Sequence, residues 1–162
     1  MAQRGIREYD AKRLIAESLS EYSEGELTYQ ADVILVGPQT DLDKIPDEYP
    51  WVTQAKLVVK PDQLFGKRGK NNLLYVNQSW GAVKKWIQKH MEQTVSVIQT
   101  TGTTAGILTH FLVERFVPHE TEYYLAITTH RDHDTIHFSM QGGVDIEEVW
   151  DTVRTLNVHV LS

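Results

Sequence analysis

The chain has no cysteine among its 162 residues and no long apolar run. Without cysteine it forms no disulfides or thiolate metal sites, which is compatible with a reducing cytosol. A membrane-spanning helix needs roughly 18 or more apolar residues in succession. A secretion signal needs an apolar stretch after the first basic residue, here Arg4, and none follows. We therefore expect a cytoplasmic protein that is neither secreted nor inserted in a membrane.

Basic residues are outnumbered and unevenly distributed, with 16 Lys and Arg against 22 Asp and Glu and a net charge of −6. Residues 1–59 carry 6 basic and 11 acidic side chains, residues 60–89 carry 7 and 1, and residues 90–162 carry 3 and 10. A nucleic-acid duplex needs many Lys and Arg on one surface, so nucleic acid is not an expected partner. The short basic window fits a compact anion better.

Several motifs of known chemistry are also missing. The chain contains no Walker loop GxxxxGK[ST] and no Rossmann fingerprint GxGxxG. It also lacks the GxSxG turn that carries a hydrolase nucleophile. No repeat, low-complexity tract or Gly/Ser linker interrupts it. Hydrolase chemistry is therefore unsupported, and the whole chain is expected to belong to one folded assembly.

The apolar pattern of the first half predicts helices alternating with short strands. Asp10 and Ser79 are placed to cap two helices whose inner positions recur at spacings of three and four. Strands are predicted over 31–36, 56–60 and 73–76, and the last two are expected to pair across the basic segment. The inner positions are Ala11, Leu14, Ile15, Leu19 and Tyr22 in the first helix and Trp80, Val83, Trp86, Ile87 and Met91 in the second.

From residue 94 onward the pattern predicts mainly strands. In the strand over 135–140, Ile136, Phe138 and Met140 alternate with polar residues, which is typical of an antiparallel strand with one buried face. Helices mixed with antiparallel strands in this order favour an α+β fold. The predicted strands are 95–99, 107–117, 123–129, 135–140 and 156–161.

Two glycines and a capping box predict the end of one strand and the start of a helix near the end of the chain. Gly142 and Gly143 break the preceding strand, and Asp145 followed by Glu148 forms a capping box for a last helix. The apolar positions of that helix are Ile146, Val149, Trp150 and Val153. The tryptophans lie on apolar stripes or beside a proline, so we expect all of them in the core; they are Trp51, Trp80, Trp86 and Trp150.

The densest chemistry lies in the basic segment 60–70, KPDQLFGKRGK. Its glycines allow a close approach of the backbone, and four cations face one acid, Asp62. This suits a phosphate group, although a solvated hairpin tip explains the spacing about as well. Lys60 favours a binding site, because it closes an apolar strand and its ammonium should be directed at a partner. The four cations are Lys60, Lys67, Arg68 and Lys70.

The run LVVKPDQLFGKRGK (57–70) closely resembles the ATP-binding portion of the ATP-citrate lyase family, of the type in which this part lies on the shorter of two subunits. Four further segments match that family in the same order. Because the matches are collinear over most of the chain, we identify it as similar to roughly the first two-fifths of that subunit. The segments are GIREYDAKRL (5–14), FLVERFVPH (111–119), EYYLAI (122–127) and GGVDIEEVWD (142–151).

The resemblance implies an ATP-grasp fold, in which two small α+β lobes with mixed or antiparallel sheets hold the nucleotide between them. Residues 23–117 would form the lobe with the phosphate loop, and residues 1–22 and 118–162 would form part of the other, incomplete lobe. It also implies that Lys60 contacts the α- and β-phosphates, while Arg68 and Gly69 lie where a Gly-rich loop covers the phosphates.

The resemblance further assigns the adenine and ribose contacts. The segment from Glu114 to Val117 matches the hinge between lobes, with Phe116 and Val117 at the adenine pocket wall, and Glu122 matches the acid that binds the ribose hydroxyls. A strand that ends before Pro118 can offer such a slot, because proline cannot pair onward. Taken from the residues alone, a core strand and a surface acid are the simpler interpretations.

The family's reaction uses ATP to phosphorylate an enzyme histidine, passes the phosphoryl group to citrate, forms citryl-CoA and cleaves it to acetyl-CoA and oxaloacetate. The family's Mg²⁺ ligands, citrate domain, CoA site and phosphorylated histidine lie beyond residue 162, so no catalytic or metal-binding residue is assigned here. We expect a nucleotide-binding part of that enzyme, inactive alone. Its expected partners are ATP, Mg²⁺, the second subunit and, through the missing domains, citrate and CoA.

Two alternatives stay open at this point. One is a β-type subunit of citryl-CoA or succinyl-CoA synthetase, which are acid–CoA ligases that keep the ATP chemistry. The other is a non-catalytic module that binds a nucleotide or docks against a partner subunit.

A histidine-rich segment at 130–134, HRDHD, lies close to His137 and contains several potential metal ligands. It falls where two strands need a turn, and Arg131 would oppose a cation. We therefore interpret it as an exposed hairpin and not as a metal site. His119 follows the expected hinge and is interpreted as a loop residue.

Overall fold

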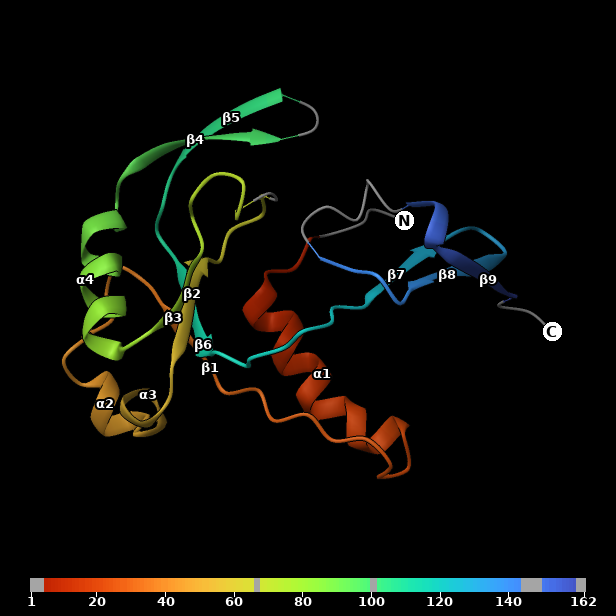
Figure 1. Ribbon diagram of the computed structural model, residues 1–162, viewed down its shortest axis with the longest axis horizontal. Coiled ribbons are helices and arrows are strands. Elements are labelled where there is room, and N and C mark those ends of the chain that lie inside the picture. Colours follow the sequence, from red (N-terminus) through yellow and green to blue (C-terminus); the bar gives the residue numbers. More distant parts are fainter. Residues whose placement is uncertain (1–4, 66–67, 100–101, 144–149, 160–162) are drawn as a thin grey trace. The chain divides into compact units, whose positions relative to one another are not determined.

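The computed structural model describes residues 5–65, 68–99, 102–143 and 150–159. The chain forms two compact units, residues 1–116 and 117–162, which can be followed by colour in Figure 1. Helices in the first unit and antiparallel sheets in both units confirm the predicted α+β class. Within the described ranges, no helix has the length and apolar character needed to cross a bilayer.

The larger unit is built on a four-stranded antiparallel sheet in the order β1-β6-β2-β3. Branched apolar residues dominate β1 and β2, as is common in strands with a buried face. The predicted pairing of the strands on either side of the basic segment is confirmed, because β2 pairs with β3. The four strands are β1 (Val33–Val36), β6 (Phe111–Arg115), β2 (Leu57–Pro61) and β3 (Tyr75–Gln78).

The two faces of this sheet differ in chemistry. One face is the apolar core, against which α4 packs. Lys60 and Glu114 project from the other face, because the register pairs Lys60 with Leu112 and Glu114 with Val58. Figure 1 shows α4 and α1 on opposite sides of the sheet. The sheet residues of the core are Ile34, Val36, Leu57, Val59, Phe111 and Val113.

Three helices surround the core face. They are α2 (Ile45–Glu48), α3 (Trp51–Gln54) and α4 (Trp80–His90). The last begins directly after Ser79 as predicted, although that side chain makes no cap hydrogen bond. Val83 and Ile87 are fully buried on its inner side. Three tryptophans pack against the core, which confirms the prediction for Trp51, Trp80 and Trp86.

Helix α1 (Glu8–Tyr22) starts earlier than predicted. Asp10 is not its cap, because the carboxylate of Asp62 accepts hydrogen bonds from the backbone N–H groups of Glu8 (3.0 Å) and Tyr9 (3.4 Å). The cap therefore comes from a residue far along the chain. The predicted inner stripe is also wrong in part, since the structure leaves three of its apolar residues exposed; they are Leu14, Ile15 and Tyr22.

The predicted strand over 107–117 is shorter in the structure, where it is β6 (Phe111–Arg115) of the main sheet. The segment before it forms β5 (Gly102–Ile107), which the sequence did not predict and which pairs with β4 (Thr94–Gln99) in a separate two-stranded hairpin. The chain turns between β5 and β6 because Leu108 is buried in the core and His110 accepts a backbone hydrogen bond from Asp62.

The second unit is an antiparallel sheet of three strands in the order β7-β8-β9. Its burial is the reverse of the sequence prediction: Thr135 and Ser139 are buried, whereas Phe138 is 42% and Met140 70% exposed. The strands are β7 (Tyr124–Thr129), β8 (His133–Ser139) and β9 (Arg154–His159).

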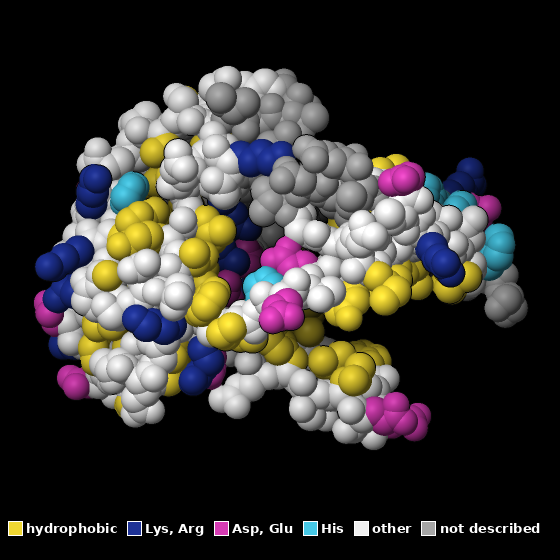
Figure 2. Space-filling model, viewed as in Figure 1, with side chains coloured by type: hydrophobic (Ala, Val, Ile, Leu, Met, Phe, Trp, Pro, Cys, Tyr) yellow, Lys and Arg dark blue, Asp and Glu magenta, His cyan; other side chains and the backbone are white. Residues whose placement is uncertain are grey.

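Local contacts explain the reversal. The polar face of this sheet is covered by Trp150, whose ring meets Tyr124 edge-on, and by Thr152, which shares a 2.7 Å hydrogen bond with Ser139. The apolar face has no cover among the described residues, and Figure 2 shows yellow side chains in a row along this unit. Trp150 is itself 51% exposed, so its predicted core position is wrong. The predicted capping box of Asp145 and Glu148 lies outside the described residues.

Candidate functional site

Lys60 lies in a group of charged side chains between the sheet and α1. Its ammonium is 2.6 Å from Oε1 of Glu8 and 2.8 Å from Oε1 of Glu114. The three side chains are only 14%, 22% and 16% exposed, respectively. The sequence expectation that Lys60 is directed at a partner is therefore met, and in this structure the partners are two carboxylates.

Two further cations complete this group. Arg68 places Nη2 2.7 Å from Oε2 of Glu8 and donates from Nη1 to the carbonyl of Pro61 at 2.8 Å. Lys12 lies one helical turn after Glu8, pairs with it at 3.1 Å and also contacts Glu114. We call this set the ion-pair cluster, and its members are Glu8, Lys12, Lys60, Arg68 and Glu114.

Opposite charges hold Glu8 and Lys12 in their ionised forms. Burial disfavours the charged carboxylate of Glu8, but the hydrogen bond and charge of Lys60, with the charges of Lys12 and Arg68, outweigh it and lower the pKa of Glu8 to about 2. Burial likewise opposes the charge of Lys12, yet the bond to Glu114 and both neighbouring carboxylates raise the pKa of Lys12. Both groups therefore stay charged at neutral pH.

Asp62 fixes the start of α1 beneath the cluster. Its side chain is 1% exposed, and its carboxylate accepts the backbone N–H groups of Glu8 and Tyr9. Burial raises the pKa of Asp62, against the effect of these two hydrogen bonds. Because Asp62 follows β2 directly, it ties the first turn of α1 to the end of the strand that carries Lys60.

The other predicted phosphate and adenine residues are arranged along the same unit. Gly69 follows Arg68 and is exposed, and no atom of the described residues lies within 4 Å of where a Cβ would stand. The half-buried Phe116 donates its backbone N–H to the carbonyl of Lys56 at 2.7 Å, just beyond β6. Lys67, one of the predicted cations, lies outside the described residues. The structure thus brings together Lys60, Arg68 and Glu114 of the predicted set.

Val117 and Glu122 belong to the second unit. Val117 is 64% exposed. His119 has Nε2 2.7 Å from Oε1 of Glu122 and Nδ1 2.8 Å from the carbonyl of Val117. That carbonyl and the carboxylate raise the pKa of His119, because a protonated imidazole donates to both. Glu122 is therefore an exposed acid with a partner of its own, and His119 is a loop residue as predicted.

Two glycines fit closely around Glu122. Gly142 donates its N–H to the carbonyl of Glu122 at 2.8 Å, and a Cβ on it would lie 2.5 Å from backbone atoms of Tyr123. Gly143 has a positive φ of 111°, and a Cβ there would lie 2.8 Å from the Glu122 carboxylate. The glycine pair that the sequence marked as a strand break thus holds the backbone at Glu122.

Sequence reasoning missed Glu8 and Lys12 of the ion-pair cluster, and it missed the contact of Asp62 with the start of α1. A signal was present, because Glu8 and Lys12 are an oppositely charged pair at i and i+4 within the segment 5–14 that carried part of the resemblance. The spacing alone does not reveal that this pair meets Lys60.

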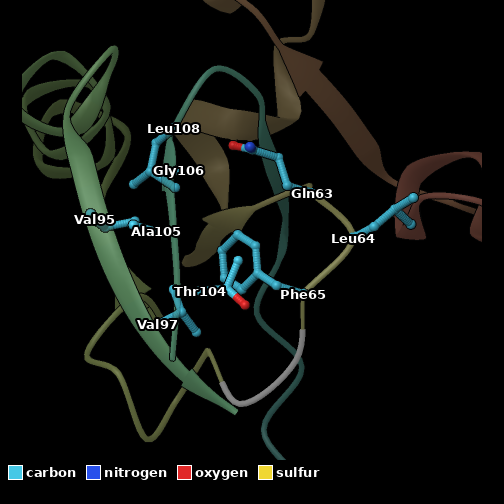
Figure 3. A pocket seen from close by; sticks show the side chains of 9 residues that line it. All are labelled: Gln63, Leu64, Phe65, Val95, Val97, Thr104, Ala105, Gly106 and Leu108. Atoms are coloured by element: carbon cyan, nitrogen blue, oxygen red, sulfur yellow. The ribbon is translucent and has the colours of Figure 1, made fainter. Parts of the chain in front are cut away.

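A separate cavity of about 190 Å³ lies between the segment after β2 and the β4–β5 hairpin. Figure 3 shows Phe65 directed toward Thr104 across it, with Gln63 at its edge. The Gln63 amide is already engaged, donating to the carbonyl of Ile107 and accepting from the N–H of Thr109, both at 3.0 Å. The cavity is therefore mainly apolar, and among the described residues none of the predicted nucleotide contacts lines it.

The histidine-rich turn shows ring stacking. His130 and His133 stack with centroids 4.5 Å apart, and His133 pairs with Asp132 at 2.9 Å. Across the described ranges, no group of three or more His, Asp or Glu side chains is arranged to hold a metal ion.

Comparison with known proteins identifies the family. A family model described as the ATP-citrate synthase ATP-grasp domain matches residues 2–162. ATP-citrate synthase alpha chain protein 2 of Arabidopsis thaliana is 40% identical over 158 residues, which cover 98% of this chain and 36% of the plant protein. ATP-citrate synthase subunit alpha chain protein 1 of rice, Oryza sativa subsp. japonica, is 42% identical over 156 residues, covering 96% and 37%.

A solved structure agrees. ATP citrate lyase from Methanothrix soehngenii, in complex with citrate and coenzyme A, matches with a TM-score of 0.85 and 42% identity over 99% of this chain and 36% of that one. The chain therefore spans a little over a third of the length of these relatives. With a family match over nearly all of its residues, this chain belongs to the ATP-citrate synthase ATP-grasp domain family.

Proposed function

We propose that this chain binds ATP as the nucleotide-recognising part of an ATP-citrate lyase, an enzyme that uses ATP, citrate and CoA to make acetyl-CoA and oxaloacetate. The observation that carries the proposal is the meeting of Lys60 and Arg68 through Glu8, at the end of β2 in a member of this family. The family match favours it over the acid–CoA ligase subunits and over an inert module.

The chemistry of the cluster suits a triphosphate. Phosphoryl transfer depends mostly on positioning and charge neutralisation, which Lys60 and Arg68 supply through N–H donors. Mg²⁺ bound to ATP would neutralise further charge. The described carboxylates do not fit a resident metal site, since Glu8 and Glu114 are already paired with cations. The family's metal ligands are expected beyond residue 162, as are the sites for citrate, CoA and the phosphorylated histidine.

Adenine and ribose would be held next to the phosphates. Phe116 and Val117 would form the apolar wall of the adenine slot, and the Glu122 carboxylate would accept the ribose hydroxyls after exchanging its bond to His119. Gly69 would let the backbone approach the phosphates closely, because it has no side chain and no described atom lies within 4 Å of its Cβ position.

The lobe division is part of the same proposal, with residues 23–117 forming one lobe and residues 1–22 with 118–162 contributing to the other. The exposed apolar residues of α1, Leu14, Ile15 and Tyr22, support a second packing partner for this helix beyond the sheet that anchors its first turn. A second subunit and a cytoplasmic location complete the proposal.

Calorimetric titration tests the proposed function. We expect the folded chain to bind ATP in the presence of Mg²⁺, and to bind tripolyphosphate and adenosine more weakly, because each carries only part of the contacts. Circular dichroism of the same sample would verify that the chain is folded. A folded chain that does not bind ATP would contradict the proposal, whether or not it binds tripolyphosphate.

The ribose contact has its own test. Glu122→Gln should weaken the binding of ATP several-fold and leave the binding of 2′,3′-dideoxy-ATP nearly unchanged. Only ATP has the ribose hydroxyls that donate hydrogen bonds to the carboxylate. Glu120→Gln, a neighbouring exposed acid, is the matched control and should change neither ligand. If Glu122→Gln left the ratio of the ATP and dideoxy-ATP affinities unchanged, Glu122 would be only a surface acid.

A further inference from the structure

The first turn of α1 reaches into the proposed phosphate site through Glu8. We propose that Glu8 is a positioning residue whose carboxylate holds Lys60 and Arg68 together, so that both cations meet the same polyphosphate. This inference rests on the proposed function and assigns a role to a residue outside the predicted nucleotide-binding set.

Glu8 is a bridge between two separate chain segments. Its Oε1 lies 2.6 Å from the ammonium of Lys60 on β2, and its Oε2 lies 2.7 Å from Nη2 of Arg68, which comes after the strand. Among the described acids, Glu8 alone pairs with both cations; Glu114 pairs with Lys60 and Lys12. This one carboxylate therefore links the two cations directly.

The bridge leaves donors for a ligand. An ammonium has three N–H bonds and a guanidinium has five. Lys60 uses two of its three on Glu8 and Glu114, and Arg68 uses two of its five on Glu8 and Pro61, counting the described acceptors. A phosphate oxygen can thus be bound without displacing Glu8, which makes the carboxylate an orienting partner.

Glu8 is itself held in place. The carboxylate of Asp62, 1% exposed, accepts the backbone N–H of Glu8, and the neighbouring cations lower the pKa of Glu8, despite its burial, to about 2. The bridging group is therefore both fixed and charged at neutral pH.

The net charge of the cluster predicts the opposite effect of Glu8 on ATP binding, and this difference can be tested. With Asp62 included, the three cations of the cluster face three carboxylates, so removing the charge of Glu8 would make the site more positive. If attraction by net charge dominated, Glu8→Gln would tighten ATP binding. If Glu8 positions the donors, the same change would weaken it, because Lys60 and Arg68 lose their common anchor.

The experiment is calorimetric titration of the chain and its Glu8→Gln variant with ATP and with adenosine. We expect the variant to lose about tenfold in ATP affinity, equivalent to one weakened charge-assisted hydrogen bond, with adenosine changed less than about twofold. The matched control is Glu17→Gln, which removes an exposed acid of the same helix that pairs with Arg13 at 2.9 Å. It should change neither ligand.

Two results would overturn the inference: equal or tighter ATP binding by Glu8→Gln, or an equal loss for ATP and adenosine, which would mark a purely structural role. Failure of the proposed function looks different. An unmodified chain that binds tripolyphosphate but not ATP would refute ATP recognition, and the inference would then be judged by whether Glu8→Gln weakens tripolyphosphate. An unmodified chain that binds neither would contradict both.

Discussion

The two units of this chain bury their apolar residues to very different degrees. In residues 1–116 one face of the main sheet is closed by α4 and two short helices, and Phe111 and Leu57 are fully buried. In residues 117–162 the three-stranded sheet exposes most of its apolar face, with Leu125 65% and Ile127 63% exposed. The first unit has a core of its own, whereas the second has an apolar face without cover among the described residues.

The charged groups differ in the same way. The ion-pair cluster in the first unit is mostly shielded from solvent, and its carboxylates each meet two or more cations. In the second unit, His119 and Glu122 form a single pair in which both side chains are 49% exposed. The carboxylates of the cluster are therefore held by several partners each, whereas the Glu122 side chain has one exposed contact, to His119.

The largest expected effect is a loss of stability when the core of the first unit is disrupted. Phe111→Ala should lower the free energy of unfolding by about 3–5 kcal/mol, because it removes a fully buried ring that meets Trp86 edge-on. Leu125→Ala on the exposed face of the second unit should cost less than about 0.5 kcal/mol. Urea unfolding of both variants measures the difference. A comparable loss in Leu125→Ala would show that the apolar face of β7 is covered in solution.

A second prediction concerns the pH dependence of the cluster. The folded pKa of Glu8, about 2, lies below its ordinary value of 4.5, so its ionised form stabilises the fold above pH 4.5 and this contribution is lost as the pH falls toward 2. Near pH 6 the unmodified chain should be more stable than Glu8→Gln by about 2 kcal/mol, allowing for partial solvent screening. The difference should shrink between about pH 5 and pH 2.

Urea unfolding across this pH range provides the measurement. Glu17→Gln serves again as the control, because Glu17 is 63% exposed and has one partner, and its stability difference should stay small at every pH. A difference between the unmodified chain and Glu8→Gln that does not change with pH would mean that the charge of Glu8 contributes nothing to the fold.

The smallest expected effect is a difference in stability between alanine substitutions at two glycines. Gly142→Ala should destabilise the second unit by about 1–2 kcal/mol, because the new methyl group would overlap backbone atoms of Tyr123 at 2.5 Å. Gly106→Ala in β5 should be close to neutral, since no atom of the described part of the chain lies within 4 Å of its Cβ position. Thermal unfolding followed by circular dichroism compares them. Equal stability of the two variants would contradict the tight backbone packing beside Glu122.

Local pattern predicted the elements well where a strand has one apolar face in a closed core. β2, its partner β3 and the helix after Ser79 follow from alternation and helical spacing. These element predictions succeeded because the pattern that defines each of them lies within a few neighbouring residues. The nucleotide-binding roles that the family resemblance implies for Lys60, Arg68 and Glu114 stay predictions.

The remaining features depend on residues distant in the sequence. The start of α1 is set by Asp62, 54 residues after Glu8, and no local pattern contains that contact. The burial of β8 was predicted in reverse because its apolar alternation was assumed to face a core, whereas the structure covers the polar face with Trp150 and Thr152. The sequence pattern of a strand indicates which residues share a face, but it does not indicate which face other residues cover.

The central claim is that the positive charge of Lys60 binds the phosphates of ATP. Its most direct test is calorimetric titration of Lys60→Met with ATP and with adenosine, beside Lys85→Met, which alters an exposed lysine of α4. We expect Lys60→Met to weaken ATP by more than about tenfold, because a charge-assisted contact to phosphate is lost, while adenosine changes little and Lys85→Met changes neither. Equal losses of ATP and adenosine in Lys60→Met, or no loss of either, would contradict the claim.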